Sequence, residues 1–235
     1  MIALYTDFGS QGPYVGQLHA VLANQAQGIP VVDLFHDVPS YNIRAGAYLL
    51  PSYVSAFPAG TVFVCVVDPG VGSDRRAVYL KADDYWYVGP DNGLFQILAR
   101  RARQVSCYAI DWRPQNLSHS FHGRDLFAPV AAMLSLGQKP RAKPASLHGG
   151  ENSQWPDDLA EVVYIDRFGN ATTGFRATAL SSKTMIRINK SVVGFSRTYS
   201  GVAIGEIFWY ENANGLVEIA VNQGSAAEID RKSVV

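Results

Sequence analysis

The chain has 235 residues, 48% of them hydrophobic and 17% charged, enough for one large globular domain or two unequal ones. Twenty basic and twenty acidic side chains give a formal net charge of zero, which argues against a nucleic-acid-binding protein steered by phosphate charge. No run of about 18 apolar residues could span a membrane, and the first residues lack the basic segment of a signal peptide. Cys65 and Cys107 lack a CxxC spacing, so buried free thiols in a cytoplasmic protein are expected.

The N-terminal part alternates between two kinds of hydrophobic pattern. Short apolar runs predict strands at residues 2–5, 30–34, 61–67, 77–80, 85–88 and 105–110. Helical spacing predicts helices at residues 14–24, 43–55, 94–103 and 124–136, the second of them interrupted or restarted at Pro51. This alternation predicts a three-layer α/β domain with a mostly parallel sheet, over residues 1–140.

The pattern changes after residue 140. Residues 141–158 contain prolines and paired glycines without apolar periodicity, which predicts a linker. Short strands are then expected at 159–165, 184–188, 206–210 and 216–221, giving a small all-β, barrel-like domain over residues 159–235. A domain of this size is marginally stable alone, so it is expected to pack against the first domain or a neighbouring subunit.

The central predicted strand, residues 61–67, ends in a group of residues that could carry chemistry. It is followed by Asp68, by a turn with Gly70 and Gly72, and by Arg75 and Arg76. Open α/β sheets place their active sites at such strand ends. The alternative is a tight turn in which Asp68 caps backbone amides and both arginines are solvated.

Polar residues also follow other predicted strands: Asp7, His36-Asp37 and Asp91-Asn92. Such strand ends meet at one edge of a parallel sheet. His122, flanked by Phe121 and Gly123 before a predicted helix, can exchange protons, although a capping or packing role is the alternative.

The C-terminal part has a comparable cluster in Asp166, Phe168 and Asn170, directly after a strand. A carboxylate, an aromatic face and an amide could hold a purine and an ammonium group, and Tyr199 and residues 212–222 add further groups of these kinds. Ordinary turn chemistry is the alternative for these residues.

Several familiar motifs are absent. The chain has no P-loop and no complete dinucleotide fingerprint, and its Asp7-Phe8-Gly9 stands without the other protein-kinase motifs. The histidines and carboxylates lack HxH, HExxH and DxD spacings. No metal and no cofactor are therefore predicted, with a metallohydrolase as an alternative drawn from composition alone.

Six segments together resemble the S-adenosyl-L-methionine hydroxide adenosyltransferases, relatives of the fluorinating and chlorinating adenosyl enzymes. They run in the family's order from Thr6 to Glu228: TDFGSQGPYVG, VVDPGVGSDRR, GPDNGL, FHGRDLFAP, YIDRFGN and EIAVNQGSAAE. The resemblance implies an α/β N-terminal domain, a small C-terminal β domain and a homotrimer. It places each active site between the N-terminal domain of one subunit and the C-terminal domain of its neighbour.

The implied reaction converts S-adenosyl-L-methionine and water to adenosine and L-methionine, without metal or cofactor. The family's water-activating triad maps onto Asp68, Arg75 and His122. The resemblance implies that Asp7 contacts the ribose hydroxyls and that Asp166 contacts the methionine amine. Further substrate contacts, mainly on the adenine side, are implied for Phe168, Asn170, Tyr199 and Asn222. Asp68 would repel a halide ion and Gly123 has no hydroxyl to bind one, which argues against halogenation.

Three positions depart from the family's pattern. Gly12 and His19 stand where relatives often carry Asp and Lys, and Ala213-Asn214 replaces a serine-bearing pair that contacts the methionine carboxylate. The altered pair motivates an alternative hypothesis, a non-catalytic protein that binds adenosine or S-adenosyl-L-methionine as a sensor. A halide-using adenosyl enzyme is the further alternative.

Overall fold

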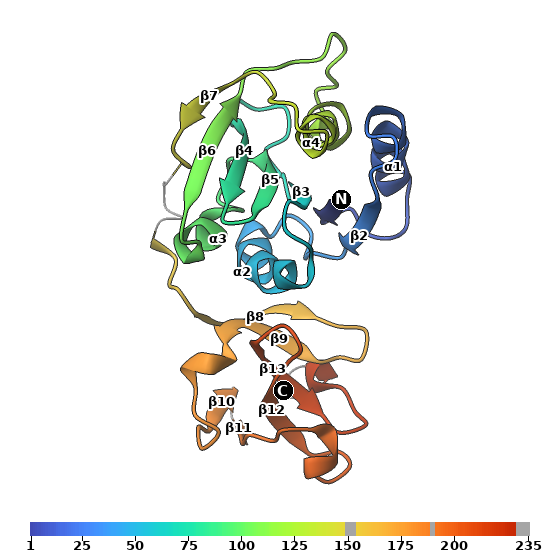
Figure 1. The fold of residues 1–235 in the computed structure, drawn as a ribbon. Helices are drawn as coiled ribbons and strands as arrows, with labels where there is room; N and C mark the ends of the chain where they lie inside the picture. The colour runs from blue at the N-terminus through green and yellow to red at the C-terminus, as the bar shows by residue number, and fades with distance from the viewer. Residues whose placement is uncertain (149–153, 189–190, 229–235) are drawn as a thin grey trace. The chain divides into compact units, whose positions relative to one another are not determined.

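A computed structural model describes residues 1–148, 154–188 and 191–228. The chain forms two compact units, Met1–Gln154 and Trp155–Val235 (Figure 1). The expected fold class is confirmed, because helices and a large sheet make up the first unit and the second is built from strands. The domain limits predicted from the sequence stay a prediction.

The N-terminal unit is built on a seven-stranded sheet in the order β2-β1-β3-β5-β4-β6-β7. The strands are β1 (Ile2–Thr6), β2 (Val31–Phe35), β3 (Val62–Val66), β4 (Ala77–Ala82), β5 (Tyr85–Pro90), β6 (Val105–Ile110) and β7 (Ala142–Ala145). Strands β2, β1, β3 and β5 pair in parallel, whereas β4 pairs antiparallel with both β5 and β6, and β7 antiparallel with β6. The sheet is therefore mixed, with its parallel half at the β2 side, and not mostly parallel as the sequence pattern predicted.

Helices cover both faces of this sheet. Helices α1 (Tyr14–Gln25) and α4 (Ala128–Ser135) pack together, as do α2 (Ile43–Tyr53) and α3 (Gln96–Arg101) (Figure 1). Alternate side chains of β1 point to opposite faces: Leu4 packs in the core with α1 and α4, whereas the Tyr5 hydroxyl donates to the Gly46 carbonyl of α2. Within the described residues, no helix is long and apolar enough to cross a membrane.

Three segments of this unit differ from the sequence-based expectation. Helix α2 continues through Pro51 to Tyr53 and passes directly into a 3-10 turn, Val54–Ala56. Residues Gly123–Phe127 form a π-helical turn, η2, before α4 begins. Strand β7 lies inside the segment predicted to be a linker; its Pro144 is tolerated because β7 is an edge strand.

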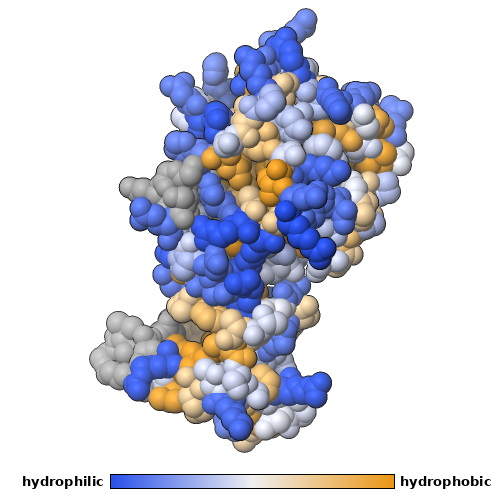
Figure 2. Space-filling view, turned by 60° about the vertical axis from the view of Figure 1, so that its left-hand side comes forward, coloured by the Kyte–Doolittle hydropathy of each residue, from blue (hydrophilic) through white to orange (hydrophobic). Residues whose placement is uncertain are grey.

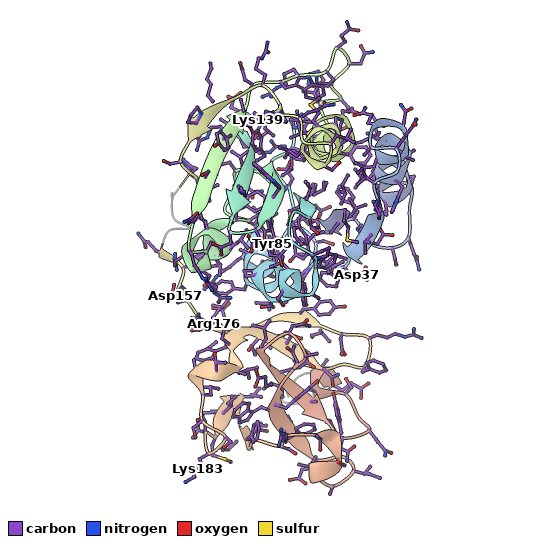
Figure 3. All side chains as sticks on the ribbon, viewed as in Figure 1. Asp37, Tyr85, Lys139, Asp157, Arg176 and Lys183 are labelled. Carbon is purple, nitrogen blue, oxygen red and sulfur yellow. The ribbon has the colours of Figure 1, made fainter. Side chains whose placement is uncertain are left out.

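The C-terminal unit combines a four-stranded antiparallel sheet, in the order β12-β13-β9-β8, with a two-stranded hairpin. The strands are β8 (Leu159–Ile165), β9 (Ala171–Arg176), β10 (Ile186–Ile188), β11 (Ser191–Val193), β12 (Ile207–Glu211) and β13 (Leu216–Val221). Trp209 and Val193 are buried in its core. Arg176, labelled in Figure 3, binds the Asp158 carboxylate through Nε at 2.7 Å and a terminal nitrogen at 2.6 Å.

Gly89 is a point where β5 approaches β3 too closely for a side chain. A Cβ atom there would overlap the Cys65 carbonyl oxygen and lie 2.9 Å from the Phe95 ring. Gly89→Ala is expected to lower the free energy of unfolding by about 2 kcal/mol or more, measured by urea denaturation.

Gly16→Ala is the matched control, since a Cβ at Gly16 in α1 meets nothing within 4 Å. This control should raise stability by roughly 0.5–1 kcal/mol, because alanine favours a helix over glycine. Equal effects of the two substitutions would contradict the close approach of β5 to β3.

Candidate active site

A cavity of about 470 Å³ opens where β1 and β3 end. Asp7 follows β1 and Asp68 follows β3, and because the two strands are parallel neighbours, both carboxylates reach this cavity. His122, directly before the π-helical turn η2, lines it as well. The remaining lining is mainly aromatic and small: Phe8, Tyr14, Ser40, Tyr41, Val66, Val71, Ser120, Phe121 and Gly123.

Arg75 joins Asp68 to His122 from behind the cavity wall. Its Nε donates to Asp68 Oδ1 at 2.8 Å, and a terminal nitrogen donates to Asp68 Oδ2. The same terminal nitrogen lies 2.9 Å from His122 Nδ1. The Arg75 and Asp68 side chains are 10% and 4% exposed, and the guanidinium lies 5.4 Å from the centre of the Phe127 ring. The three residues therefore form one hydrogen-bonded group, in which Asp68 and the half-buried His122 face the cavity.

The contact with Arg75 determines where His122 carries its proton. A guanidinium can only donate hydrogen bonds, so Nδ1 accepts from Arg75 and the neutral imidazole holds its hydrogen on Nε2. Burial, and then the positive charge of Arg75, lower the pKa of His122 below its ordinary value of 6.5. His122 is therefore neutral at pH 7.

Two features hold the loops that carry these side chains. Gly72 has φ +83°, and a Cβ there would lie 2.5 Å from the His119 carbonyl oxygen, so the turn after Asp68 can approach residue 119 only with glycine. Asp125 accepts hydrogen bonds from the Ser118 backbone at 3.0 Å and from Arg124 at 2.6 Å. The Arg124 hydrogen bond lowers the pKa of Asp125 and keeps it ionised in this role.

Asp7 forms the opposite part of the cavity. Its Oδ2 accepts a hydrogen bond of 2.9 Å from the backbone of Tyr41, which has φ 63°. Burial, and to a smaller extent the negative charge of Asp68, raise the pKa of Asp7. Tyr41 and Tyr14 also line the cavity, although sequence analysis assigned neither a role. Tyr14 lies in the first family segment, whereas Tyr41 belongs to none of the six segments.

Other polar residues at strand ends support the fold and do not line the cavity. His36 is buried, with Nδ1 2.8 Å from Thr6 Oγ1 and Nε2 3.0 Å from Asp33 Oδ1. Asp91 pairs with Arg76 at 2.5 Å, so Arg76 is not merely solvated. Of the polar residues expected to meet at the ends of the strands, only Asp7 and Asp68 therefore share the cavity.

In the C-terminal unit, the Asp166 carboxylate shapes its own turn. It accepts hydrogen bonds from the backbone of Phe168 at 2.8 Å and from the backbone and side chain of Asn170 at 2.9 and 2.8 Å. The turn chemistry considered as an alternative is thus present. It leaves the Phe168 ring 77% exposed, beside a buried Asn170.

The two remaining predicted residues of this unit lie elsewhere on it. The Asn222 amide donates to the Val202 carbonyl at 2.9 Å, whereas Tyr199 is 37% exposed and packs edge-on against Phe208 at 5.2 Å.

A second cavity, of about 590 Å³, contains none of the predicted site residues. It lies in the C-terminal unit and is lined mostly by aliphatic side chains. Val162 and Ile165 at its border are 51% and 49% exposed, and Figure 2 shows hydrophobic residues on the visible face of this unit. Among the described residues, no group of three or more His, Cys, Asp or Glu side chains could hold a metal ion.

The chain is similar to proteins of one family along nearly its whole length. The family profiles for the SAM hydroxide adenosyltransferase N-terminal and C-terminal domains match residues 2–143 and 160–230. A (R)-S-adenosyl-L-methionine hydrolase from Thermus thermophilus is 39% identical, with 95% of this chain and 92% of the relative covered. A fluorinase from Actinopolyspora mzabensis is 24% identical over 97% of this chain and 92% of the relative.

A crystal structure of a conserved protein from Thermotoga maritima has the same fold. It superposes with a TM-score of 0.83 at 29% identity, covering 98% of this chain and 96% of the other. Because both family profiles match and together cover most of the sequence, the chain belongs to the SAM hydroxide adenosyltransferase family.

Proposed function

We propose that this protein hydrolyses S-adenosyl-L-methionine to adenosine and L-methionine. The observation that carries the proposal is the hydrogen-bonded group in which Arg75 joins two residues of the cavity wall, Asp68 and His122. The names of the relatives from Thermus thermophilus and Salinispora arenicola, at 39% and 36% identity, support it. S-adenosyl-L-methionine is the substrate, and the proposal needs no further cofactor.

The chemical difficulty of this reaction lies with the nucleophile. The sulfonium of S-adenosyl-L-methionine leaves readily as a neutral thioether, so departure needs no acid. Water, with a pKa near about 16, is a poor nucleophile and must lose a proton as it attacks C5′ in line with the leaving sulfur. The enzyme therefore has to hold one water molecule and accept its proton.

The geometry favours Asp68 as the proton acceptor. His122 Nδ1 already accepts from Arg75, so a proton could be added there only if Arg75 moved away. Each Asp68 oxygen accepts one hydrogen bond from Arg75 and keeps a lone pair for water. In the proposed mechanism Asp68 takes the proton, His122 Nε2–H orients the oxygen, and Arg75 positions both.

The same carboxylate distinguishes water from a halide ion. The Asp68 carboxylate faces the cavity and can only accept hydrogen bonds, so it can bind a water molecule but offers no donor to a halide ion. This supports hydrolysis over halogenation, although fluorinases are among the relatives.

Substrate contacts are proposed for both units of the chain. Asp7, in the same cavity as Asp68, would bind the two ribose hydroxyls through its carboxylate. The C-terminal unit would bind the adenine and methionine parts of the substrate through five residues: Asp166, Phe168, Asn170, Tyr199 and Asn222.

We propose a homotrimer in which a site combines the N-terminal unit of one subunit with the C-terminal unit of its neighbour. The two free, buried cysteines, Cys65 and Cys107, support a cytoplasmic location.

The direct test is incubation of the purified protein with S-adenosyl-L-methionine, followed by chromatography for adenosine and methionine. Equal amounts of the two products above the blank are expected. Asp68→Asn should lower kcat by about a hundredfold or more while adenosine still binds, because the amide cannot take the proton. Tight binding without any product would overturn the proposal and favour a sensor.

Two adjacent arginines provide a matched pair of variants. Arg75→Lys should lower kcat by at least about tenfold, because lysine cannot hold Asp68 by two parallel hydrogen bonds and also reach His122. Arg76→Lys is the control, since Arg76 pairs with Asp91 outside the cavity. A similar loss of kcat in both variants would contradict the special role of Arg75.

The pH dependence of the rate should report the protonation of His122. Because its pKa is below 6.5, His122 is neutral at higher pH, and protonation as the pH falls would break its hydrogen bond from Arg75. Above pH 6.5, titration of His122 should not change kcat/KM. At lower pH, kcat/KM measured from initial rates should fall with an apparent pKa below 6.5.

The control for this profile is another histidine close in sequence. His122→Gln should abolish this acid limb, because the glutamine amide does not titrate. His119→Gln should leave the profile unchanged, because the His119 side chain is exposed and does not line the cavity. A limb centred above pH 6.5 in the wild type would contradict the assignment.

A further inference from the structure

Glu218 is a carboxylate in the middle of the C-terminal sheet. It lies on β13, whose six residues are all buried, and is itself 7% exposed. Within the described ranges, no ion pair with a basic side chain involves it. Burying a carboxylate is costly unless strong hydrogen-bond donors surround it.

Three neutral donors from separate parts of the unit meet this carboxylate. Thr172 Oγ1 of β9 donates to Oε2 at 2.5 Å, and Asn212 Nδ2 donates to the same oxygen at 3.0 Å. The Tyr210 hydroxyl of β12 donates to Oε1. Glu218 thus holds β9, β12 and the start of the β12–β13 turn together.

One branch of this network extends to Tyr199. The Tyr199 and Tyr210 hydroxyl oxygens are 3.1 Å apart. Because Tyr210 has given its only proton to Glu218, Tyr199 must be the donor in this contact. The orientation of the Tyr199 ring, which is 37% exposed, therefore depends on a chain of two hydrogen bonds that ends at Glu218.

The other branch shapes the turn between β12 and β13. While Asn212 Nδ2 donates to Glu218, its Oδ1 accepts from the backbone of Asn214 at 3.0 Å and of Leu216 at 3.1 Å. This turn contains Ala213-Asn214, the pair that replaces the residues expected at the methionine carboxylate. The first branch thus ends at Tyr199, to which the proposed function assigns a substrate contact. The second ends at the turn that the family resemblance places beside the methionine carboxylate.

We propose that Glu218 is a positioning residue for substrate binding, which acts through Tyr210 on Tyr199 and through Asn212 on the β12–β13 turn. This inference rests on the proposed function, because that function assigns Tyr199 to the adenine. Asp68 and His122 belong to the N-terminal unit and receive no hydrogen bond from this network. Glu218 should therefore govern affinity and leave the chemical step intact.

The test compares Glu218→Gln and Tyr210→Phe with Tyr85→Phe. Tyr85, labelled in Figure 3, donates its hydroxyl to the Phe57 carbonyl at 2.9 Å in the N-terminal unit, so its variant loses a tyrosine hydrogen bond outside the network. Calorimetry gives the Kd for adenosine, and initial rates give KM and kcat for S-adenosyl-L-methionine. Glu218→Gln and Tyr210→Phe should each raise Kd and KM about tenfold with kcat within about threefold of the wild type. The Tyr85→Phe variant should match the wild type.

A wild-type Kd and KM in Tyr210→Phe would overturn the inference, even if Glu218→Gln fails to fold. The double variant adds a second criterion: it should bind adenosine no more weakly than the weaker single variant, because both substitutions break one chain. Additive losses would contradict the route through Tyr210. If the wild type binds adenosine without hydrolysing S-adenosyl-L-methionine, the proposed function is wrong, while the adenosine affinities still decide this inference.

Discussion

The geometry of the candidate active site depends on one buried guanidinium. Arg75 donates two hydrogen bonds to Asp68 and a third to His122, so a single planar group orients both side chains that face the cavity. Arg75 also pairs with the Asp68 carboxylate and fixes the tautomer of His122. The imidazole carries its hydrogen on Nε2, because Nδ1 must accept the hydrogen bond from Arg75. Without Arg75, Asp68 would be an unpaired carboxylate buried in the cavity wall, which is strongly unfavourable.

The fold brings this group together by ordinary means. Parallel neighbours β1 and β3 end side by side and deliver Asp7 and Asp68, while Gly72 lets the following turn approach the segment before His122. In the C-terminal unit the central buried group is negatively charged. It is the Glu218 carboxylate, which accepts hydrogen bonds from three neutral side chains. In both units a buried ionisable group orients side chains that are proposed to meet the substrate.

Much of this could be predicted from the sequence, for identifiable physical reasons. Residues 216–221 form a short apolar run between turn signals, which predicts a strand, and β13 has those limits. Strand β9 was missed because its polar threonines and Gly174 hide its pattern, and β7 because Pro144 suggested a linker. The grouping of Asp68, Arg75 and His122 was expected from family resemblance, since no local pattern relates residues 68 and 122. The hydrogen-bond directions, and the whole Glu218 network, depend on side-chain geometry that spacing along the chain does not encode.

The central claim is that water attacks C5′ of the ribose, and the fate of the water oxygen tests it most directly. Hydrolysis of S-adenosyl-L-methionine in ¹⁸O-enriched water, followed by mass spectrometry, locates that oxygen. We expect the label in the 5′-hydroxyl of adenosine and none in methionine, because the thioether leaves with its own atoms. Unlabelled adenosine, or label in methionine, would contradict attack by water at C5′.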